Sequence, residues 1–277
     1  MESRLTAYLA RIGLAAPVTP DADGLEAVQR AHRMAIGFEN FDVMLGRGIA
    51  IEAQAIFAKL VAGGRGGYCF EHNALFGDML AAMGFPSRPL LARVFIGLPA
   101  GQMPPRTHTL RLVDLDGEAW IADAGFGAAY APPLPLRDGA QATTPDGAQH
   151  RLIDQGGGAW RLERLGPQAA TDGRAGDAQG WLHQHSFDLG EVAEIDLALS
   201  NHWTSTKPET RFTTACIASI VLEDGFASLN GRRLSVYTGG QSTVREISTA
   251  QEWRKVVGDL FNIALSAEEV AALYQAA

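Results

Sequence analysis

The sequence predicts an α+β protein in which a helical part, a strand-rich part and a smaller mixed α/β part follow one another. Apolar residues recur at helical spacing up to about residue 85 and alternate with period two from Ser87 onward. Of the 277 residues, 47% are hydrophobic and 19% are charged, so the chain can bury a sizeable core. These observations exclude a disordered chain and favour one large domain or two to three small ones.

Helices are expected first. Apolar residues at helical spacing place them at 5–12, 25–35, 56–61 and 69–83. Pro20 and Asp21 supply turn and cap residues before the second helix, and Gly63-Gly64 closes the third. The fourth helix begins near Cys69 and ends at Gly84.

Strands are expected next, at 87–97, 107–113 and 118–123. Asp116-Gly117 between the last two is a strong signal for a tight hairpin turn. Residues 131–180 are rich in Gly, Pro, Ala, Gln and Asp, which indicates a loop-rich β region with short strands at 151–153 and 159–165.

The last part alternates between the two element types. A short connecting helix is expected at 191–200, and the strands expected after it cover 212–222, 226–229 and 232–237. Helices at 251–261 and 266–274 close the chain, the second with a capping box formed by Ser266 and Glu269.

Composition limits the partners and the compartment. The net charge of −8 argues against nucleic acid and anionic membrane, because both require a basic face. No run of about 18 apolar residues would span a membrane, and the charged N-terminus lacks a signal-peptide apolar stretch. Cys69 and Cys216 do not form a disulfide framework. A cytoplasmic protein is therefore expected.

Cys69 is the candidate nucleophile. It lies in the run 65–73, Arg-Gly-Gly-Tyr-Cys-Phe-Glu-His-Asn. The two glycines allow close backbone approach, and the helical pattern that follows places Cys69 at a helix N-terminus, where the thiol pKa is expected to fall. Cys216 has apolar strand-forming neighbours and is expected to be a buried structural residue.

His108 and Asp123 are the candidate base and its orienting acid. If Asp116-Gly117 forms a two-residue turn, Asp123 faces Leu110, and His108 lies two residues away on the same face. The two side chains then form a diagonal pair within reach of each other. A turn one residue longer would place them on opposite faces. Because Asp123 lies in an otherwise apolar strand, its carboxylate requires a partner.

Other histidines compete for these roles. His72, three residues after Cys69 on the predicted helix, is the nearer rival as a base, but no orienting acid is evident for it. A metal set of His183, His185 and His202 with Cys216 is disfavoured, because the spacing matches no zinc signature and the segment is loop-like. No metal site is predicted.

Arg65 is predicted to anchor the nucleophile loop. It precedes two glycines that have no side chains to hold the loop in place. A bidentate pair between its guanidinium group and the Glu39 carboxylate would fix the loop.

At these residues the sequence resembles the arylamine N-acetyltransferases. The resemblance covers most of the chain in order. It rests on the nucleophile run 65–73 and on four further segments, which are Phe38-Glu39-Asn40-Phe41-Asp42, Thr107-His108, Asp123-Ala124-Gly125-Phe126-Gly127 and Asn201–Pro208. One departure is Ala128, where the family often has a second glycine after Gly127.

The resemblance implies a fold and a set of roles. The fold would be a helical bundle (1–85) that carries the nucleophile, a β-barrel (86–195) that carries the His and Asp, and an α/β lid (196–277), with a cysteine-protease-like catalytic core. Cys69, His108 and Asp123 would form a catalytic triad. The predicted substrate-binding residues are Phe38, Phe126, Gly127 and Trp203.

The implied reaction is acetyl-CoA-dependent N-acetylation of arylamines and aryl hydrazines, by a ping-pong mechanism through an acetyl-Cys69 thioester. Acetyl-CoA would be a cosubstrate, with no permanently bound cofactor. Its phosphates need a local basic patch, and residues 201–277, with seven basic against eight acidic residues, are the least acidic part of the chain. The oligomeric state is left open.

Three other functions remain possible from the sequence. An amide synthase would use the same chemistry with a longer acyl donor. A thiol hydrolase, such as a protease or a transglutaminase-like enzyme, would share the triad but admit water. A non-catalytic binding protein would retain the fold alone.

Overall fold

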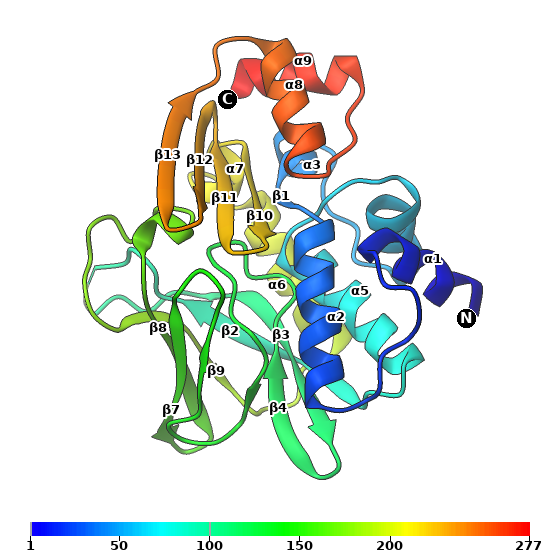
Figure 1. Cartoon of the computed structure of the whole chain (residues 1–277), viewed down its shortest axis with the longest axis vertical. Helices are drawn as coiled ribbons and strands as arrows, with labels where there is room; N and C mark the ends of the chain where they lie inside the picture. Colours follow the sequence, from blue (N-terminus) through cyan, green and yellow to red (C-terminus); the bar gives the residue numbers. More distant parts are fainter. Residues whose placement is uncertain (1, 100) are drawn as a thin grey trace.

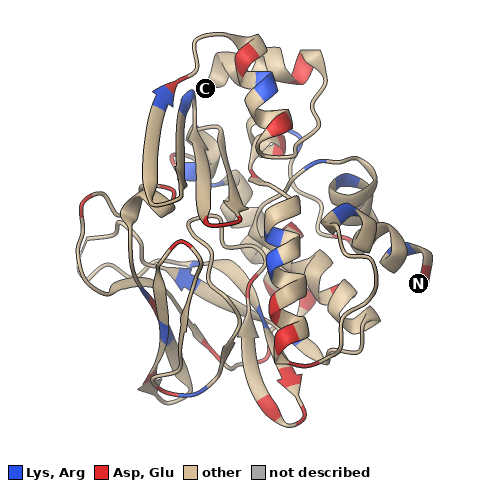
Figure 2. Cartoon of the chain, viewed as in Figure 1, with Lys and Arg blue, Asp and Glu red and all other residues tan. Residues whose placement is uncertain are grey.

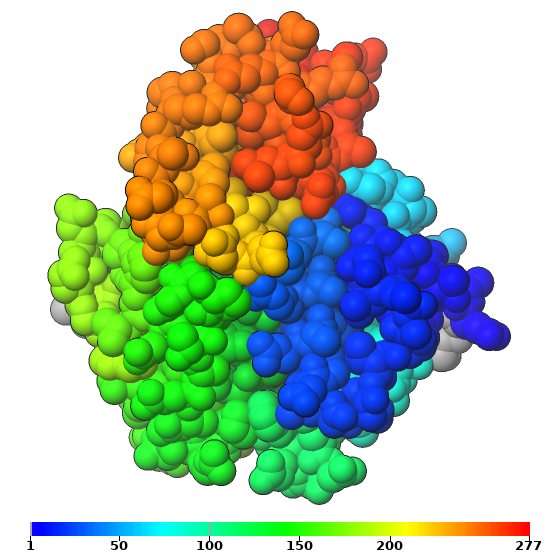
Figure 3. Space-filling model, viewed as in Figure 1, coloured from blue at the N-terminus to red at the C-terminus, as the bar shows by residue number. Residues whose placement is uncertain are grey.

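The computed structural model describes residues 2–99 and 101–277 and confirms the α+β prediction (Figure 1). N-terminal helices lie beside an eight-stranded, barrel-like sheet, and a five-stranded sheet with two helices lies above both in this view. Figure 3 shows the C-terminal part, in orange and red, in contact with both of the others. No helix within the described ranges has the length and apolar character needed to cross a membrane.

The N-terminal helices lie where the apolar spacing predicts them, except for the short α3, which was not predicted. They are α1 (Glu2–Ile12), α2 (Ala22–Ala35), α3 (Phe41–Met44), α4 (Ala53–Phe57), the π-helical η1 (Ala58–Ala62) and α5 (Cys69–Ala82). Asp21 caps α2, since its side chain accepts a hydrogen bond from the Gly24 N–H at 2.8 Å. Helices α1, α2 and α5 share a core with Val113 and Ala122 of the large sheet, so the sheet holds α5 in place.

The large sheet is antiparallel throughout, in the order β5-β4-β3-β2-β9-β8-β7-β6. Its strands are β2 (Ser87–Val94), β3 (Arg106–Leu115), β4 (Glu118–Ala122), β5 (Leu134–Pro135), β6 (Gln141–Thr143), β7 (Gln149–Gly156), β8 (Ala159–Leu165) and β9 (Leu182–Asp188). A short 3₁₀ turn, η2 (Gln168–Ala170), follows β8.

The hairpin between β3 and β4 has the predicted register. Asp116 and Gly117 both have positive φ, 53° and 89°, as a two-residue type I′ turn requires. Arg111 consequently pairs with Ala122. The position after Ala122 is Asp123, which places it beside the His108 end of β3, as expected.

Strand β9 was not predicted, and the expectation of a loop-like segment around His183 and His185 is wrong. Its sequence is Leu-His-Gln-His-Ser-Phe-Asp, and its buried residues include Gln184 and His185 as well as Phe187. Apolar alternation does not detect a strand whose inward positions are polar. The strand pairs with β2 and β8 and closes the middle of the sheet.

The C-terminal part combines a second sheet with helices. The sheet has the order β1-β10-β11-β12-β13, with β1 (Phe38–Glu39), β10 (Ile217–Leu222), β11 (Gly225–Asn230), β12 (Arg233–Thr238) and β13 (Gln241–Glu246). The helices are α6 (Glu194–Thr206), α7 (Arg211–Thr214), α8 (Ala250–Asp259) and α9 (Ala267–Ala276). The capping box of α9 is confirmed, because the Glu269 N–H donates to Ser266 Oγ and the Ser266 N–H to Glu269 Oε2.

The strand expected over 212–222 is correct only from Ile217 onward. Residues before it form α7, in which the Thr214 hydroxyl donates to the Thr210 carbonyl at 2.7 Å. Threonine has high strand propensity, but here its hydroxyl satisfies backbone groups of a helical turn.

The three parts of the chain meet at one apolar cluster around Cys69. Phe38 and Tyr68 come from the N-terminal segment, Leu91 from β2 and Ile217 from β10. Cys69 itself is only 3% exposed. The nucleophile candidate therefore lies at the junction of both sheets and the helices.

Candidate active site

Cys69 is the first residue of α5. The Tyr68 N–H, just before it, donates to Glu71 Oε2 at 3.0 Å, which satisfies one of the free donors at the helix start. Glu71 is in turn held by Lys59, with Nζ 2.7 Å from Oε1. These contacts fix the first turn of α5 and therefore the direction of the Cys69 side chain.

The glycines of the nucleophile loop are required by close packing. A Cβ atom on Gly66 would lie 2.2 Å from the Gly37 carbonyl oxygen, and one on Gly67 would lie 2.8 Å from Glu71 Oε2. Neither glycine has a positive φ. The prediction of close backbone approach is thus confirmed, and its cause is lack of space rather than an unusual backbone angle.

Arg65 contacts Glu39, as predicted, but the predicted bidentate pair is wrong. Its Nη2 lies 3.2 Å from Glu39 Oε1 and 3.1 Å from Asp42 Oδ1, and its Nη1 lies 3.2 Å from Glu269 Oε1. The guanidinium group therefore joins three carboxylates instead of gripping one. Through Glu269 it ties the nucleophile loop to α9.

The Arg65→Lys variant should lower the free energy of unfolding by about 2 kcal/mol, because one ammonium group cannot replace contacts to three carboxylates. Urea denaturation measures the loss. Arg47→Lys is the matched control, since Arg47 contacts Asp42 and Glu269 from a half-exposed position and should cost less than about 1 kcal/mol. Equal losses of unfolding free energy in the two variants would show that the buried contacts of Arg65 add no more stability than the half-exposed contacts of Arg47.

His108 and Asp123 form the predicted pair. His108 Nε2 lies 2.6 Å from Asp123 Oδ2, and both side chains are buried. Burial alone would raise the pKa of Asp123, but the imidazole of His108 lowers it to about 2. Asp123 is therefore a carboxylate over the whole neutral range, and it can orient the ring and stabilise its charged form.

The second oxygen of Asp123 is held separately. Oδ1 accepts hydrogen bonds from Asn73 Nδ2 at 3.0 Å and from the Gly125 N–H at 2.9 Å. The Asp123 N–H itself donates to Gln29 Oε1 at 2.8 Å. Asn73 of α5 and the Gly125 N–H thus fix the carboxylate plane, and Gln29 of α2 holds the Asp123 backbone.

Asn73 and Gln29 were not identified from the sequence. Asn73 had a usable signal, because it lies four residues after Cys69 and so on the same side of α5. Gln29 had none, since only the packing of α2 on the sheet brings it near Asp123.

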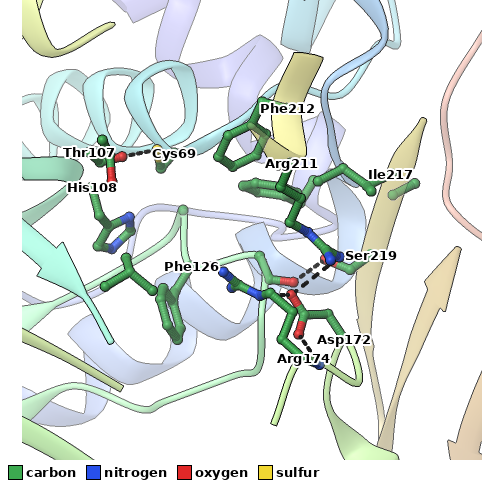
Figure 4. A pocket seen from close by; sticks show the side chains of 15 residues that line it. Cys69, Thr107, His108, Phe126, Asp172, Arg174, Arg211, Phe212, Ile217 and Ser219 are labelled. Atoms are coloured by element: carbon green, nitrogen blue, oxygen red, sulfur yellow. Dashed lines mark hydrogen bonds and ion pairs between the residues drawn. The ribbon is translucent and has the colours of Figure 1, made fainter. Parts of the chain in front are cut away.

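Cys69 and His108 open onto the same cavity. Cys69 Sγ donates to the carbonyl oxygen of Thr107, the neighbour of His108, at 3.6 Å. Figure 4 shows the thiol and the imidazole on the same side of the cavity. With Nε2 held by Asp123, ring atom Nδ1 is the nitrogen left for the thiol. We predict that Cys69 Sγ lies within about 4 Å of this nitrogen, as a nucleophile and its base require.

Burial raises the pKa of the Cys69 thiol well above its usual value, and the Asp123 carboxylate raises it further. The Phe70 backbone N–H at the helix start opposes both. The expected net fall of this pKa is therefore wrong, because burial outweighs the lowering by the helix terminus. A thiolate here needs a proton acceptor beside it.

His72 is engaged elsewhere and does not approach the role of base. Its Nδ1 lies 2.8 Å from His32 Nε2, and its Nε2 lies 3.2 Å from the Gly37 carbonyl oxygen. His32 continues the chain to the Tyr8 hydroxyl at 2.9 Å. Burial lowers the pKa of both histidines, which keeps them neutral.

The cavity at Cys69 has a volume of about 70 Å³ and aromatic walls. Three of the four predicted substrate-binding residues, Phe38, Phe126 and Gly127, line it. The Phe126 ring meets the His108 ring edge-on, with centroids 5.1 Å apart. Trp203 lies on α6, 38% exposed, and is not among the lining residues.

The Phe38 ring leaves no room for a side chain at Gly127. A Cβ atom at Gly127 would lie 2.5 Å from the Phe38 ring. The Gly127 carbonyl also accepts a hydrogen bond from Ser219 Oγ at 2.8 Å, which ties the loop to β10. Gly127 thus allows the two cavity walls to touch.

An arginine-rich groove continues from this cavity. A second cavity of about 460 Å³ shares Asp172, Arg174 and Arg211 with the first and adds Arg233 and the hydroxyl groups of several serines. Asp172 holds two of the arginines, with Oδ2 at 2.7 Å from Arg174 Nε and 3.5 Å from Arg211 Nη2 (Figure 4). In the view of Figure 2, acidic residues gather at the β3–β4 hairpin and the nearby end of α2, and basic residues lie at the other end of α2.

The metal set considered from the sequence does not assemble. His183 contacts Ser186, His202 lies on α6, and the Cys216 thiol donates to the Leu273 carbonyl. The group with metal-ligand spacing in the described ranges is instead His108, Asp123 and His185. Its first two members lie 2.6 Å apart, closer than the roughly 3.3 Å between two ligands of one tetrahedral zinc. That spacing fits a hydrogen bond.

Comparison with known proteins agrees with this geometry. A sequence model of the N-acetyltransferase family matches residues 21–270. An arylamine N-acetyltransferase / N-hydroxyarylamine O-acetyltransferase of Salmonella typhimurium is 38% identical over 226 residues, 81% of this chain and 75% of the relative. The arylamine N-acetyltransferase of Mycolicibacterium smegmatis is 32% identical over 271 residues, 96% of this chain and 94% of the relative.

Solved structures show the same similarity. The arylamine N-acetyltransferase structure from Salmonella typhimurium superposes with a TM-score of 0.89 at 32% identity and covers 100% of both chains. That of Mycobacterium marinum in complex with CoA has a TM-score of 0.86 at 30% identity and covers 98% of this chain and 99% of that one. Because sequence and backbone agree over nearly the full length, the chain belongs to the arylamine N-acetyltransferase family.

Proposed function

We propose that the protein transfers an acetyl group from acetyl-CoA to the nitrogen of arylamines and aryl hydrazines, through a thioester on Cys69. The observation that carries this proposal is that Cys69 and the His108–Asp123 pair open onto one cavity with aromatic walls. The relatives described above are named arylamine N-acetyltransferases, which supports acetyl transfer to the nitrogen of an arylamine. Both cysteines are free, which supports a reducing compartment such as the cytoplasm.

In the first half-reaction, His108 takes the proton of the Cys69 thiol and the thiolate attacks the carbonyl carbon of the acetyl donor. The bond from carbon to the CoA sulfur breaks, and CoA takes the proton as its thiol leaves. The products are a thioester on Cys69 and free CoA. Asp123 holds Nε2 throughout, so Nδ1 is the atom that exchanges the proton.

In the second half-reaction, a neutral aromatic amine attacks the carbonyl carbon of the Cys69 thioester and His108 accepts the amine proton. The bond from that carbon to Cys69 Sγ breaks, the N-acetylated amine leaves, and the proton on His108 returns to the Cys69 sulfur. Phe126 and Phe38 provide flat apolar walls for the aromatic ring, and Gly127 lets those walls approach. Trp203, on the exposed face of α6, remains a candidate for contact with the coenzyme outside this cavity. We further propose that segments 1–85, 86–195 and 196–277 act as nucleophile carrier, His–Asp carrier and lid.

The groove at Arg174, Arg211 and Arg233 is our candidate for the CoA phosphates. It adjoins the cavity of Cys69, and its guanidinium groups and serine hydroxyls suit phosphate oxygens. Because Asp172 already binds two of these arginines, phosphates would replace it as their partner. Binding of CoA would then weaken the contacts of Asp172 with Arg174 and Arg211, which line the cavity at Cys69.

The double variant Arg174→Gln/Arg211→Gln should raise KM for acetyl-CoA at least about tenfold, since two charge-assisted contacts to phosphate are lost. With a phenyl acetate donor, which has no phosphate, the rise should be much smaller. Steady-state kinetics with both donors gives the ratio. Arg161→Gln, an arginine of β8 paired with Glu163, is the control. Equal effects on both donors would remove the groove from CoA recognition.

The proposed function is tested by mixing the protein with acetyl-CoA in the absence of amine. We expect one burst of free CoA thiol and a mass increase of one acetyl group on the Cys69 peptide. Slow release should follow, and fast turnover should begin when an aniline or an aryl hydrazine is added. Water is the poorer nucleophile in a cavity with apolar walls.

The other outcomes identify the alternatives. Fast steady release without amine would indicate a thioester hydrolase. A burst with a longer acyl donor but not with acetyl-CoA would indicate an amide synthase. No burst with any donor would leave a binding protein, and the proposal would be wrong.

A further inference from the structure

A second buried histidine, His185, lies beside the candidate triad. It comes from β9, where it pairs with Val94 of β2 and Leu162 of β8. Its side chain is 1% exposed. Within the described parts of the chain, neither of its ring nitrogens has a hydrogen-bond partner. Such a group is rare in a core, because a buried donor without a partner costs about 1–3 kcal/mol.

The surroundings of His185 bring its ring close to the Asp123 carboxylate. Phe126 and Phe187 cover the ring, with centroids at 5.2 and 6.0 Å. Its Nε2 lies 3.9 Å from Asp123 Oδ2. A neutral imidazole always carries one N–H, and a movement of about 1 Å would bring that donor to hydrogen-bond distance of the carboxylate.

Asp123 has room for this donor. Its Oδ1 already accepts two hydrogen bonds, from Asn73 and Gly125. Among the residues that the structure describes, its Oδ2 accepts only that of His108 Nε2. A carboxylate oxygen accepts two, and His185 is the neighbour positioned to supply the second at Oδ2.

We propose that His185 is a positioning residue, a second imidazole whose N–H holds Asp123 Oδ2 in line with His108. The inference rests on the proposed role of His108 as the base. When His108 takes the thiol proton, the imidazolium that forms attracts Asp123 Oδ2. The His185 N–H, as a second donor to the same oxygen, keeps the carboxylate from turning toward the His108 ring. His185 thus acts through Asp123 and does not touch the substrate.

Two observations separate this role from that of a second base. His185 is not among the residues that line the cavity of Cys69. Burial, with the neighbouring His108, lowers the pKa of His185 to about 3, so the ring stays neutral at physiological pH. The neutral His185 ring still carries one N–H, which can donate to the Asp123 carboxylate.

The test compares His185→Leu, which removes the N–H but keeps an apolar side chain against Phe126 and Phe187, with His185→Gln, which keeps an N–H donor. We expect kcat for acetyl transfer to fall about tenfold in the Leu variant, the factor that one hydrogen bond to a charged group provides. KM for acetyl-CoA and for the amine should stay within about twofold, because His185 contacts neither. The Gln variant should recover most of the loss.

His150→Leu is the matched control. His150 is also fully buried in the barrel-like sheet, and both of its ring nitrogens also lack partners in the described ranges. It is not in the group formed by His108, Asp123 and His185. Its replacement should leave kcat unchanged. If the Leu variant of His185 does not fold, His185→Met provides the same comparison with a more adaptable side chain.

A second readout does not depend on transfer. The His108 ring proton bonded to Asp123 should give a far-downfield proton resonance, and this resonance should shift or broaden in His185→Leu but not in His150→Leu. The inference would be overturned if His185→Leu and His150→Leu lost kcat equally and the resonance did not change. It would also be overturned if His185→Gln were as impaired as His185→Leu. If the wild-type protein transfers no acetyl group, the proposed function fails, and the resonance still decides the role of His185.

Discussion

The Asp123→Asn variant should lose acetyl transfer by roughly ten-thousandfold while it keeps its fold. The reason lies in the two donors at Oδ1. Asn73 and the Gly125 N–H both require an oxygen there, so the amide oxygen of the substituted side chain must face them. Its NH₂ group then faces His108 Nε2 and forces the ring proton onto Nδ1. A protonated Nδ1 cannot accept the proton of the Cys69 thiol.

Turnover with acetyl-CoA and an aniline measures the loss, and circular dichroism checks the fold. Asp114→Asn is the matched control, because Asp114 lies in the same hairpin and its side chain accepts the Gly117 N–H of the turn. It should behave as the wild-type protein does. A folded Asp123→Asn variant with near-normal turnover would remove Asp123 from the mechanism.

The His108→Gln variant should lose alkylation of Cys69 at pH 7 by about a thousandfold. Burial and the Asp123 carboxylate both raise the pKa of this thiol, so without His108 it stays protonated. In the proposed mechanism His108 takes this proton, and the imidazolium that forms stabilises the thiolate beside it. In the variant, the rate should keep rising about tenfold per pH unit up to high pH, because only the free thiolate reacts.

Mass spectrometry of iodoacetamide-labelled peptides follows both cysteines at once. Cys216 is an internal control, since burial raises its pKa to about 11 and its thiol donates to the Leu273 carbonyl. His150→Gln controls for the loss of a buried histidine outside the site. If His108→Gln labels at pH 7 as fast as the wild type does, His108 is not the base.

Local sequence signals predicted the elements that local energetics control. The first residues of α2 and α9 follow from the N-caps Asp21 and Ser266, which satisfy helix N–H groups within three residues. The β3–β4 register follows from Asp116-Gly117, because its positive φ angles allow one turn geometry. That register is what predicted the pairing of His108 with Asp123.

Features that depend on contacts of polar side chains in the folded structure were not predicted correctly. Strand β9 has polar residues at its inward positions and no apolar alternation. Helix α7 has a strand-like composition, and its threonine hydroxyls satisfy the backbone instead. Arg65 was expected to grip one carboxylate, but Asp42 and Glu269 reach it from α3 and α9, which the sequence does not bring together.

The sequence by itself determined the succession of a helical, a strand-rich and a mixed part, the start of α5 at Cys69 and the His108–Asp123 hairpin pair, because each depends on residues close in the chain. Only the tertiary structure decided the pKa of the Cys69 thiol and the residues that surround Asp123. Burial between two sheets and a helix layer raises the pKa of the Cys69 thiol, and it brings Gln29 and His185 to Asp123. Desolvation and long-range contacts depend on what surrounds a group in space, and no local pattern encodes them.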